Sequence, residues 1–120
     1  MKILVVDDSS VMRKLITRSV RQAGYGNATV VEAEDGRHAL AVVEEERPDV
    51  ILADWNMPNL TGLEMLHALR AKGDRTKVGF ITSESSAEIR SAAQMGGASF
   101  FLSKPIDPAR LELALQAVAV

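Results

Sequence analysis

Five short apolar runs alternate along this chain with five segments of helical periodicity, and this alternation most restricts the possible folds. The first run, ILVV, is rich in β-branched residues, which is typical of a strand buried on both faces of a sheet. A strand followed by a helix, repeated five times, predicts a parallel sheet with helices on both faces. The expected strands are Ile3–Val6, Thr29–Ala33, Val50–Ala53, Val78–Ile81 and Ser99–Leu102.

The segments between these runs carry apolar residues at helical spacing and boundary residues that favour helix starts and ends. The boundary residues are Gly24 and Pro48 after two helices, the capping-box pairs Thr61/Glu64 and Ser85/Glu88, and the Asp107–Pro108 start of the last helix. The residues expected to face the core are Met12, Leu15, Ile16, Val20, Ala23, Leu40, Val43, Leu63, Leu66, Leu69, Ile89, Ala92, Ala93, Leu111, Ala114, Leu115 and Val118.

Two strand orders are common in sheets of this kind. With five strands and short connections we favour the order 2-1-3-4-5, counted along the chain. The predicted fold class is therefore α/β, a doubly wound, flavodoxin-like three-layer sandwich with five helices around a five-stranded parallel sheet. In such sheets ligands bind beyond the carboxyl ends of the strands, near the point where the strand order reverses.

The composition excludes several classes of protein. The 120 residues, 47% of them hydrophobic, fit one domain over residues 1–120. Fourteen basic and sixteen acidic side chains give a net charge of −2, so we expect no nucleic-acid binding by this domain. The chain has no cysteine, which rules out disulfides and cysteine metal sites and suits a reducing, cytoplasmic location. The start, MKILVVDD, is neither a signal peptide nor a membrane span, and we expect no membrane insertion.

Polar side chains come directly after four of the five runs. Asp7 and Asp8 come after the first, Asp54 after the third, Thr82 after the fourth and, past a serine, Lys104 after the fifth. In the favoured order these four strands are neighbours, so the side chains converge on one crevice. Taken alone, Asp7 or Asp8 could cap a helix, and Thr82 and Lys104 could be loop residues. Asp54 lies too far ahead of its helix to cap it.

This set of side chains favours phosphoryl chemistry on magnesium. Crowded carboxylates repel unless a cation neutralises them, and oxygen ligands without histidine or cysteine favour Mg²⁺ over zinc. A carboxylate oxygen of Asp54, central in the sheet, is the natural nucleophile toward phosphorus. Mg²⁺, the hydroxyl of Thr82 and the ammonium of Lys104 can then each receive one equatorial phosphoryl oxygen.

The chain resembles the receiver domains of two-component response regulators, especially the single-domain chemotaxis regulators of the CheY type, along essentially its whole length. CheY itself has this strand order. The motifs that carry the resemblance are VVDDSSVMR, EAEDGRHAL, DWNMPNLTGLE, ITSES and LSKP. Each motif is weak alone, and together at these spacings they are specific.

The resemblance implies a role for each residue of the crevice. Asp54 is the expected phosphoacceptor. Asp8 and Asp54 are expected to bind Mg²⁺ directly with the backbone carbonyl of Asn56, and Asp7 through a coordinated water. Lys104 is expected to pair with the phosphoryl group.

The resemblance also implies a switch. Thr82 is the expected switch hydroxyl, and Phe101 occupies the place of its aromatic partner, where the best-known chemotaxis members have tyrosine. Phe101 could equally be an ordinary core residue. Asn56 and Glu84 occupy positions that tune phosphoryl lifetime in the family, and the Lys104–Pro105 bond is expected to be cis.

The function implied is a phosphorylation-dependent switch, not an enzyme acting on separate substrates. A sensor histidine kinase or histidine phosphotransfer protein is the expected donor. The face formed by the fourth helix, fifth strand and fifth helix is the expected surface for a downstream target. Chemotaxis is one possible setting, although the outer face of the fourth helix differs from that of motor-binding chemotaxis proteins. A receiver module cut from a longer regulator with an output domain is the alternative.

Three rival functions would require a different loop after the first strand or a different site. An aspartyl-phosphate phosphatase of the haloacid dehalogenase type would place Asp-x-Asp in that loop, and this chain has Asp7-Asp8-Ser9. A flavodoxin-like carrier would have a phosphate loop there, where two carboxylates would repel a flavin phosphate. A receiver-shaped scaffold that takes no phosphate would be expected to lack part of a site that is complete here.

Overall fold

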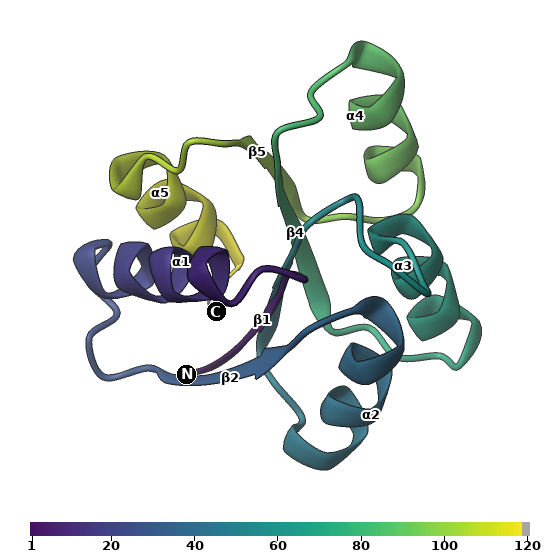
Figure 1. The fold of residues 1–120 in the computed structure, drawn as a ribbon, viewed down its shortest axis with the longest axis horizontal. Helices are drawn as coiled ribbons and strands as arrows, with labels where there is room; N and C mark the ends of the chain where they lie inside the picture. The colour runs from purple at the N-terminus through teal and green to yellow at the C-terminus, as the bar shows by residue number, and fades with distance from the viewer. Residues whose placement is uncertain (119–120) are drawn as a thin grey trace.

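The computed structural model describes residues 1–118, in which strands and helices alternate as the sequence predicts (Figure 1). In chain order the elements are β1 (Lys2–Val6), α1 (Ser10–Gln22), β2 (Thr29–Ala33), α2 (Gly36–Glu46), β3 (Val50–Ala53), α3 (Gly62–Ala71), β4 (Lys77–Thr82), α4 (Ala87–Met95), β5 (Phe100–Ser103) and α5 (Pro108–Val118). The strands match their expected positions to within one residue at each end.

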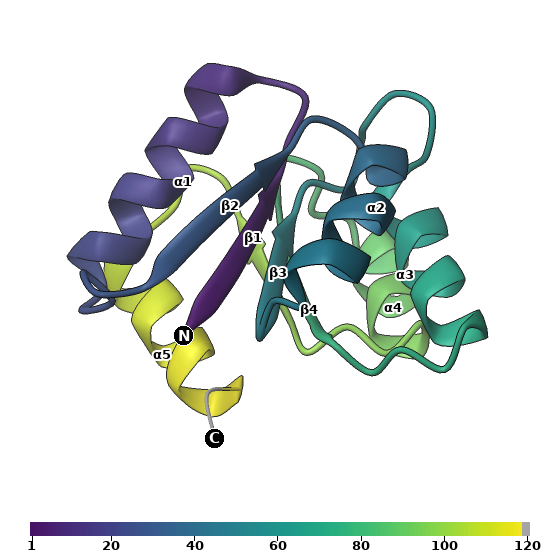
Figure 2. The same cartoon turned by 90° about the horizontal axis from the view of Figure 1, so that it is seen from below.

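The five strands form one parallel sheet in the order β2-β1-β3-β4-β5, which confirms the predicted doubly wound fold. Helices α1 and α5 cover one face of the sheet, and α2, α3 and α4 cover the other (Figure 2). The strand order reverses between β1 and β3, because β1 pairs with β2 on one side and with β3 on the other. The carboxyl ends of β1 and β3 therefore flank the predicted crevice.

The core consists of two layers separated by the sheet. Along β1, Ile3 and Val5 pack in the layer under α1 and α5, while Leu4 and Val6 pack in the layer under α2, α3 and α4. Successive side chains of a strand point to opposite faces, and all four are fully buried. This is why the run reads as continuously apolar rather than alternating.

Two local predictions are wrong. Leu15 is 48% exposed, because α1 packs through the stripe that contains Ile16 and Val20. The N-cap of α4 is Ser86 rather than Ser85, and its side chain accepts a hydrogen bond from the backbone N–H of Ile89. The loop before α4 is thus one residue longer than the capping-box pattern implies.

Other boundary residues behave as predicted. Thr61 and Glu64 form a complete capping box at the start of α3. Gly24, with φ of +100°, takes the left-handed conformation that glycine favours after a helix. Within residues 1–118 no helix is both long and apolar enough to cross a membrane.

Candidate metal centre

The backbone ladder brings the predicted acidic residues to one place. The N–H of Asp7 donates to the carbonyl of Ala33 at 3.2 Å, and the N–H of Asp54 donates to the carbonyl of Val6 at 3.0 Å. Both aspartates are therefore held by the sheet although they lie just beyond its strands. Asp8 comes next, at the start of the loop from β1 to α1.

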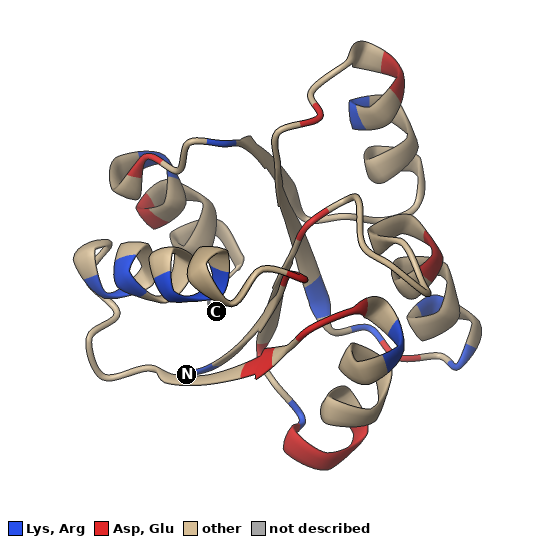
Figure 3. Ribbon diagram, viewed as in Figure 1, with Lys and Arg blue, Asp and Glu red and all other residues tan. Residues whose placement is uncertain are grey.

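Three carboxylates from two adjacent strand ends form the candidate metal centre. One oxygen from each of Asp7, Asp8 and Asp54 can be chosen so that all lie within 4.8 Å of one another. Asp7 is 1% exposed, Asp8 is exposed, and Asp54 lies between. An all-oxygen donor set with this much negative charge fits a hard divalent cation such as Mg²⁺. Figure 3 shows acidic segments at the ends of β1 and β3 and only basic charges along α1.

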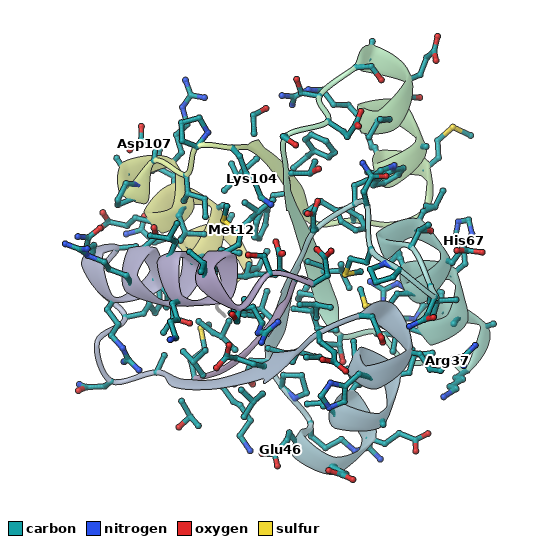
Figure 4. All side chains as sticks on the ribbon, viewed as in Figure 1. Met12, Arg37, Glu46, His67, Lys104 and Asp107 are labelled. Atoms are coloured by element: carbon teal, nitrogen blue, oxygen red, sulfur yellow. The ribbon has the colours of Figure 1, made fainter. Side chains whose placement is uncertain are left out.

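Lys104 reaches this cluster from the far end of the chain. Its Nζ lies 3.1 Å from Oδ2 of Asp7 and 3.1 Å from Oδ2 of Asp54. Its backbone N–H donates to the carbonyl of Thr82, which continues the β4–β5 ladder by one residue. The Lys104–Pro105 bond is cis, as the resemblance implies. Figure 4 shows Lys104 near the centre of the view, whereas Arg37 and His67 lie on outer helix surfaces.

Electrostatics keep Lys104 protonated. Burial by itself lowers the pKa of the Lys104 ammonium, but the hydrogen bonds that Lys104 donates to Asp54 and Asp7, together with the negative charge of these carboxylates, outweigh burial and raise that pKa above its ordinary value. The ammonium of Lys104 thus offsets part of the negative charge of the carboxylates.

The predicted switch residues lie on the adjacent strands β4 and β5. Thr82 is fully buried at the end of β4, and its hydroxyl accepts a hydrogen bond from the N–H of Glu84 at 3.2 Å. Phe101 is half-buried on β5 and lies under the guanidinium of Arg90, whose central carbon is 4.8 Å from the ring centroid. Arg90 also donates to the hydroxyl of Ser103 at 3.0 Å.

The loop from β3 to α3 is held at several points. Trp55 packs edge-on against Phe80 with ring centroids 5.1 Å apart, and its carbonyl accepts from the N–H of Gly62. Asn56 is exposed, and its N–H lies 3.4 Å from Oδ1 of Asp54. A side chain on Gly62 would have no room, because its Cβ would lie 2.5 Å from the carbonyl oxygen of Asp54 and 2.6 Å from the Phe80 ring.

Sequence reasoning missed a tether between two loops. Asp35, the N-cap of α2, accepts from the His38 N–H at 2.7 Å and from the side-chain amide of Asn59 at 2.9 Å. Asn59 has a positive φ of 69° in the loop from β3 to α3. These hydrogen bonds, first that from the His38 backbone and then that from Asn59, keep the pKa of Asp35 below its usual range. The EAEDG motif contains Asp35, but no local signal identifies Asn59 as its partner.

Comparisons with known proteins agree on the family. Residues 3–116 match the model for the response regulator receiver domain. The chain is 38% identical over 108 residues to the chemotaxis protein CheY of Pseudomonas aeruginosa, with 88% of this chain and 85% of that protein covered. It is 39% identical over 104 residues to the response regulator MprA of Mycolicibacterium vanbaalenii, with 87% of this chain and 44% of that protein covered. The chain thus spans less than half of MprA.

Solved structures show the same similarity in three dimensions. The chemotaxis protein CheY4 of Vibrio cholerae superposes with a TM-score of 0.85 at 38% identity, covering 98% of this chain and 97% of that one. The signal receiver domain of the putative response regulator NarL from Mycobacterium tuberculosis superposes with a TM-score of 0.86 at 30% identity, covering 96% of this chain and 92% of that one.

Proposed function

The chain belongs to the response regulator receiver domain family, and on this premise we propose that it is a phosphorylation-dependent switch with Asp54 as its phosphoacceptor. Receiver domains of response regulators act in two-component signalling, between histidine kinases and downstream targets. The observation that carries the proposal is the position of Lys104, which bridges Asp7 and Asp54 within the cluster of three carboxylates.

Asp54 is the acidic side chain best placed to act as the nucleophile. Asp7 is almost fully buried, and its two oxygens accept hydrogen bonds from the Ser9 N–H and from Lys104. Among residues 1–118, Lys104 donates to Oδ2 of Asp54, while Oδ1 has only the long contact with the Asn56 N–H. The Asp54 side chain is also 14% exposed, so a phosphoryl donor can approach Oδ1.

The transfer step can be derived from this arrangement. Oδ1 of Asp54 attacks the phosphorus of a phosphohistidine on a sensor kinase or a histidine phosphotransfer protein. The new O–P bond forms as the N–P bond breaks, and the departing imidazole takes a proton from solvent. Lys104 is within reach of one equatorial oxygen and places its charge where negative charge develops.

The donor set fits Mg²⁺. Asp8, Asp54 and the backbone carbonyl of Asn56 would hold the ion directly, and Asp7 would hold it indirectly. Once bound, the ion supplies positive charge that stabilises the transferring phosphoryl group. Lys104, which is ion-paired with Asp7 and Asp54, offsets part of the mutual repulsion of the carboxylates.

The output of the switch passes through β4 and β5. We propose that the hydroxyl of Thr82 moves toward the phosphoryl oxygens and that Phe101 repacks into the space it leaves. The face formed by α4, β5 and α5 then changes and is read by a target protein. Phosphorylation would thereby favour a state that is already accessible. Asn56 and Glu84, both exposed beside the site, would set how fast water hydrolyses the acyl phosphate.

Two settings are compatible with this proposal. The similarity to a chemotaxis protein supports chemotaxis as one proposed setting. The similarity to the longer response regulator MprA supports the alternative setting, a receiver module of a regulator with an output domain. In either case we propose a cytoplasmic protein that takes a phosphoryl group itself rather than turning over separate substrates, without direct nucleic-acid binding by this domain.

The decisive experiment is labelling with a radioactive small-molecule acyl phosphate in the presence of Mg²⁺. Wild-type protein should incorporate up to one phosphoryl group per chain, and Asp54→Asn should incorporate none. Asp107→Asn is the matched control, because it removes an exposed carboxylate whose partners are Arg110 and the Ala109 N–H, and it should label as wild type does. Undiminished labelling of Asp54→Asn would remove Asp54 as the acceptor. Repeated turnover of a chromogenic phosphate ester would favour the phosphatase alternative instead.

A further inference from the structure

Arg13 on α1 makes two hydrogen bonds that join three elements beside the candidate metal centre. Its Nη1 donates to the backbone carbonyl of Asp7 at 2.7 Å. Its Nε donates to Oε1 of Glu32 at 2.8 Å, on the neighbouring strand β2. The Arg13 side chain is 17% exposed, and its bond to the Asp7 carbonyl is part-buried, whereas the bond to Glu32 lies at the surface. A planar guanidinium held at two points has a fixed direction.

The carbonyl that Arg13 binds belongs to the peptide unit between Asp7 and Asp8. A peptide unit is planar, so fixing the direction of its carbonyl also fixes the bond that leads to the Cα of Asp8. The Asp8 carboxylate accepts no hydrogen bond from any residue in the described range 1–118, and its orientation therefore depends on its backbone. Asp7, by contrast, is held through its own side chain by Ser9 and Lys104.

We infer that Arg13 is a positioning residue that orients the Asp7–Asp8 peptide unit and so aims the carboxylate of Asp8 at the candidate Mg²⁺ site. This inference rests on the proposed function, because it concerns the same metal centre. Arg13 binds the backbone carbonyl of Asp7 and the carboxylate of Glu32, and it acts on Asp8 through the backbone. Partners of this kind, one contact removed from the ligands, commonly change metal affinity by about 10- to 100-fold.

Loss of Arg13 should change the affinity for Mg²⁺ in opposite directions depending on whether its positioning role or its charge dominates. Arg13 is a cation close to an acidic metal site, so losing its charge should by Coulomb's law strengthen the binding of Mg²⁺. Losing its hold on the Asp7–Asp8 peptide unit should weaken the binding. The direction of the change in affinity therefore separates positioning from electrostatics.

The test is a Mg²⁺ titration of the full chain, monitored by the emission of Trp55 and by the Mg²⁺-induced rise in melting temperature. Arg13→Met should raise the Mg²⁺ concentration at half-saturation by about tenfold or more. Arg18→Met is the matched control, since it removes an exposed cation from the same helix, and its half-saturation should be unchanged or lower. A merely structural role would lower the melting temperature of Arg13→Met equally with and without Mg²⁺.

Binding of Mg²⁺ to Arg13→Met as tight as wild type, or tighter, would overturn the inference. Circular dichroism establishes that the variant is folded, and Arg13→Gln, which also loses the two-point contact, replaces it if it is not. A wild-type chain that shows neither an emission change nor a melting-temperature shift at millimolar Mg²⁺ would instead contradict the proposed metal site. The two failures are therefore distinguishable.

Discussion

Gly62 is the residue at which the backbone beneath the candidate site packs most closely. A Cβ at this position would lie 2.5 Å from the carbonyl oxygen of Asp54 and 3.2 Å from the Cα of Trp55. Neither backbone atom can move without shifting the Asp54 carboxylate. The small size of glycine is therefore required here by close approach rather than by its backbone conformation.

We expect Gly62→Ala to lower the free energy of unfolding by about 2 kcal/mol, because overpacking a tight site costs roughly 1–3 kcal/mol. Gly26→Ala is the matched control, since its Cβ would meet no atom within 4 Å, and its effect should stay within about 0.5 kcal/mol. Urea unfolding followed by circular dichroism measures both. Equal stabilities of the two variants would show that the backbone around Gly62 can relax to accommodate a methyl group.

At the scale of single residues, the sequence indicates which side chains line the crevice, but not which residues hold the surrounding backbone and loops in place. Asp54 and Lys104 could be placed because each comes after an apolar strand, and parallel strands end on one edge. The structure brings both together with Asp7, while their chemical roles stay predictions. Arg13 and Asp35 could not be placed, because their partners come from distant segments through tertiary packing. From the sequence, a polar residue near a helix start predicts only a local hydrogen bond to the helix backbone, not a partner from a distant segment.

Among the elements, the junction between α2 and the loop from β3 to α3 has a charge-dependent contact. The pKa of Asp35 is lowered, chiefly by the hydrogen bond from the His38 backbone and then by that from Asn59, so the folded state favours the carboxylate. Because the folded pKa lies below the unfolded one, this stabilisation is present above about pH 4 and is lost as the pH falls through the folded pKa.

We expect Asp35→Ala to lower the free energy of unfolding at pH 7 by about 2 kcal/mol, about 1 for the lost N-cap and about 1 for the lost bond to Asn59. The gap between wild type and Asp35→Ala should narrow at about pH 3. Asp35→Asn can still cap α2, so it should lower the free energy of unfolding less than Asp35→Ala does. Because asparagine does not titrate, this variant should lack the part of the stability that wild type loses in acid. Urea midpoints at the two pH values test this, and a gap independent of pH would contradict it.

A second contact between elements holds the predicted switch ring. Arg90 of α4 lies over Phe101 of β5 and also binds the hydroxyl of Ser103. Any repacking of Phe101 on phosphorylation therefore has to break the contact with Arg90. Through these two contacts of Arg90, α4 is joined directly to β5 on the proposed output face.

We expect a double-mutant cycle of Arg90→Met and Phe101→Leu to give a coupling energy of about 0.5 kcal/mol, as for exposed cation–π pairs. A second cycle that pairs Phe101→Leu with Arg37→Met, on the exposed surface of α2, should give none. Both cycles are measured by urea unfolding. Additive effects in the first cycle would mean that the ring is free of Arg90 in solution.

Element boundaries show where periodicity is informative and where it is not. The strands match to within one residue because buried apolar runs have sharp ends. The predicted start of α4 is one residue early because Ser85 and Ser86 are both good N-caps, and the loop length, which no local pattern fixes, decides between them. The prediction for Leu15 fails because helical spacing does not show how wide the buried stripe of α1 is.

For the whole molecule, the fold and the metal site are linked through charge. The strand order places three carboxylates at one edge of the sheet, where they repel one another and oppose folding unless a cation is present. Lys104 supplies one positive charge from within the chain. A bound divalent ion would therefore stabilise the folded chain as a whole, since the unfolded chain does not assemble the site.

Asp8→Asn tests this linkage, because Asp8 is exposed and its replacement removes a site charge without disturbing the core. In EDTA the variant should be at least as stable as wild type, since one repulsive carboxylate is gone. Mg²⁺ at about 100 times its dissociation constant should stabilise wild type by about 2.7 kcal/mol and the variant by much less. Thermal unfolding with Mg²⁺ or EDTA at matched ionic strength measures both, with Asp107→Asn as the control that keeps the full gain. An equal gain for Asp8→Asn would show that the ion stabilises the protein from somewhere other than this cluster.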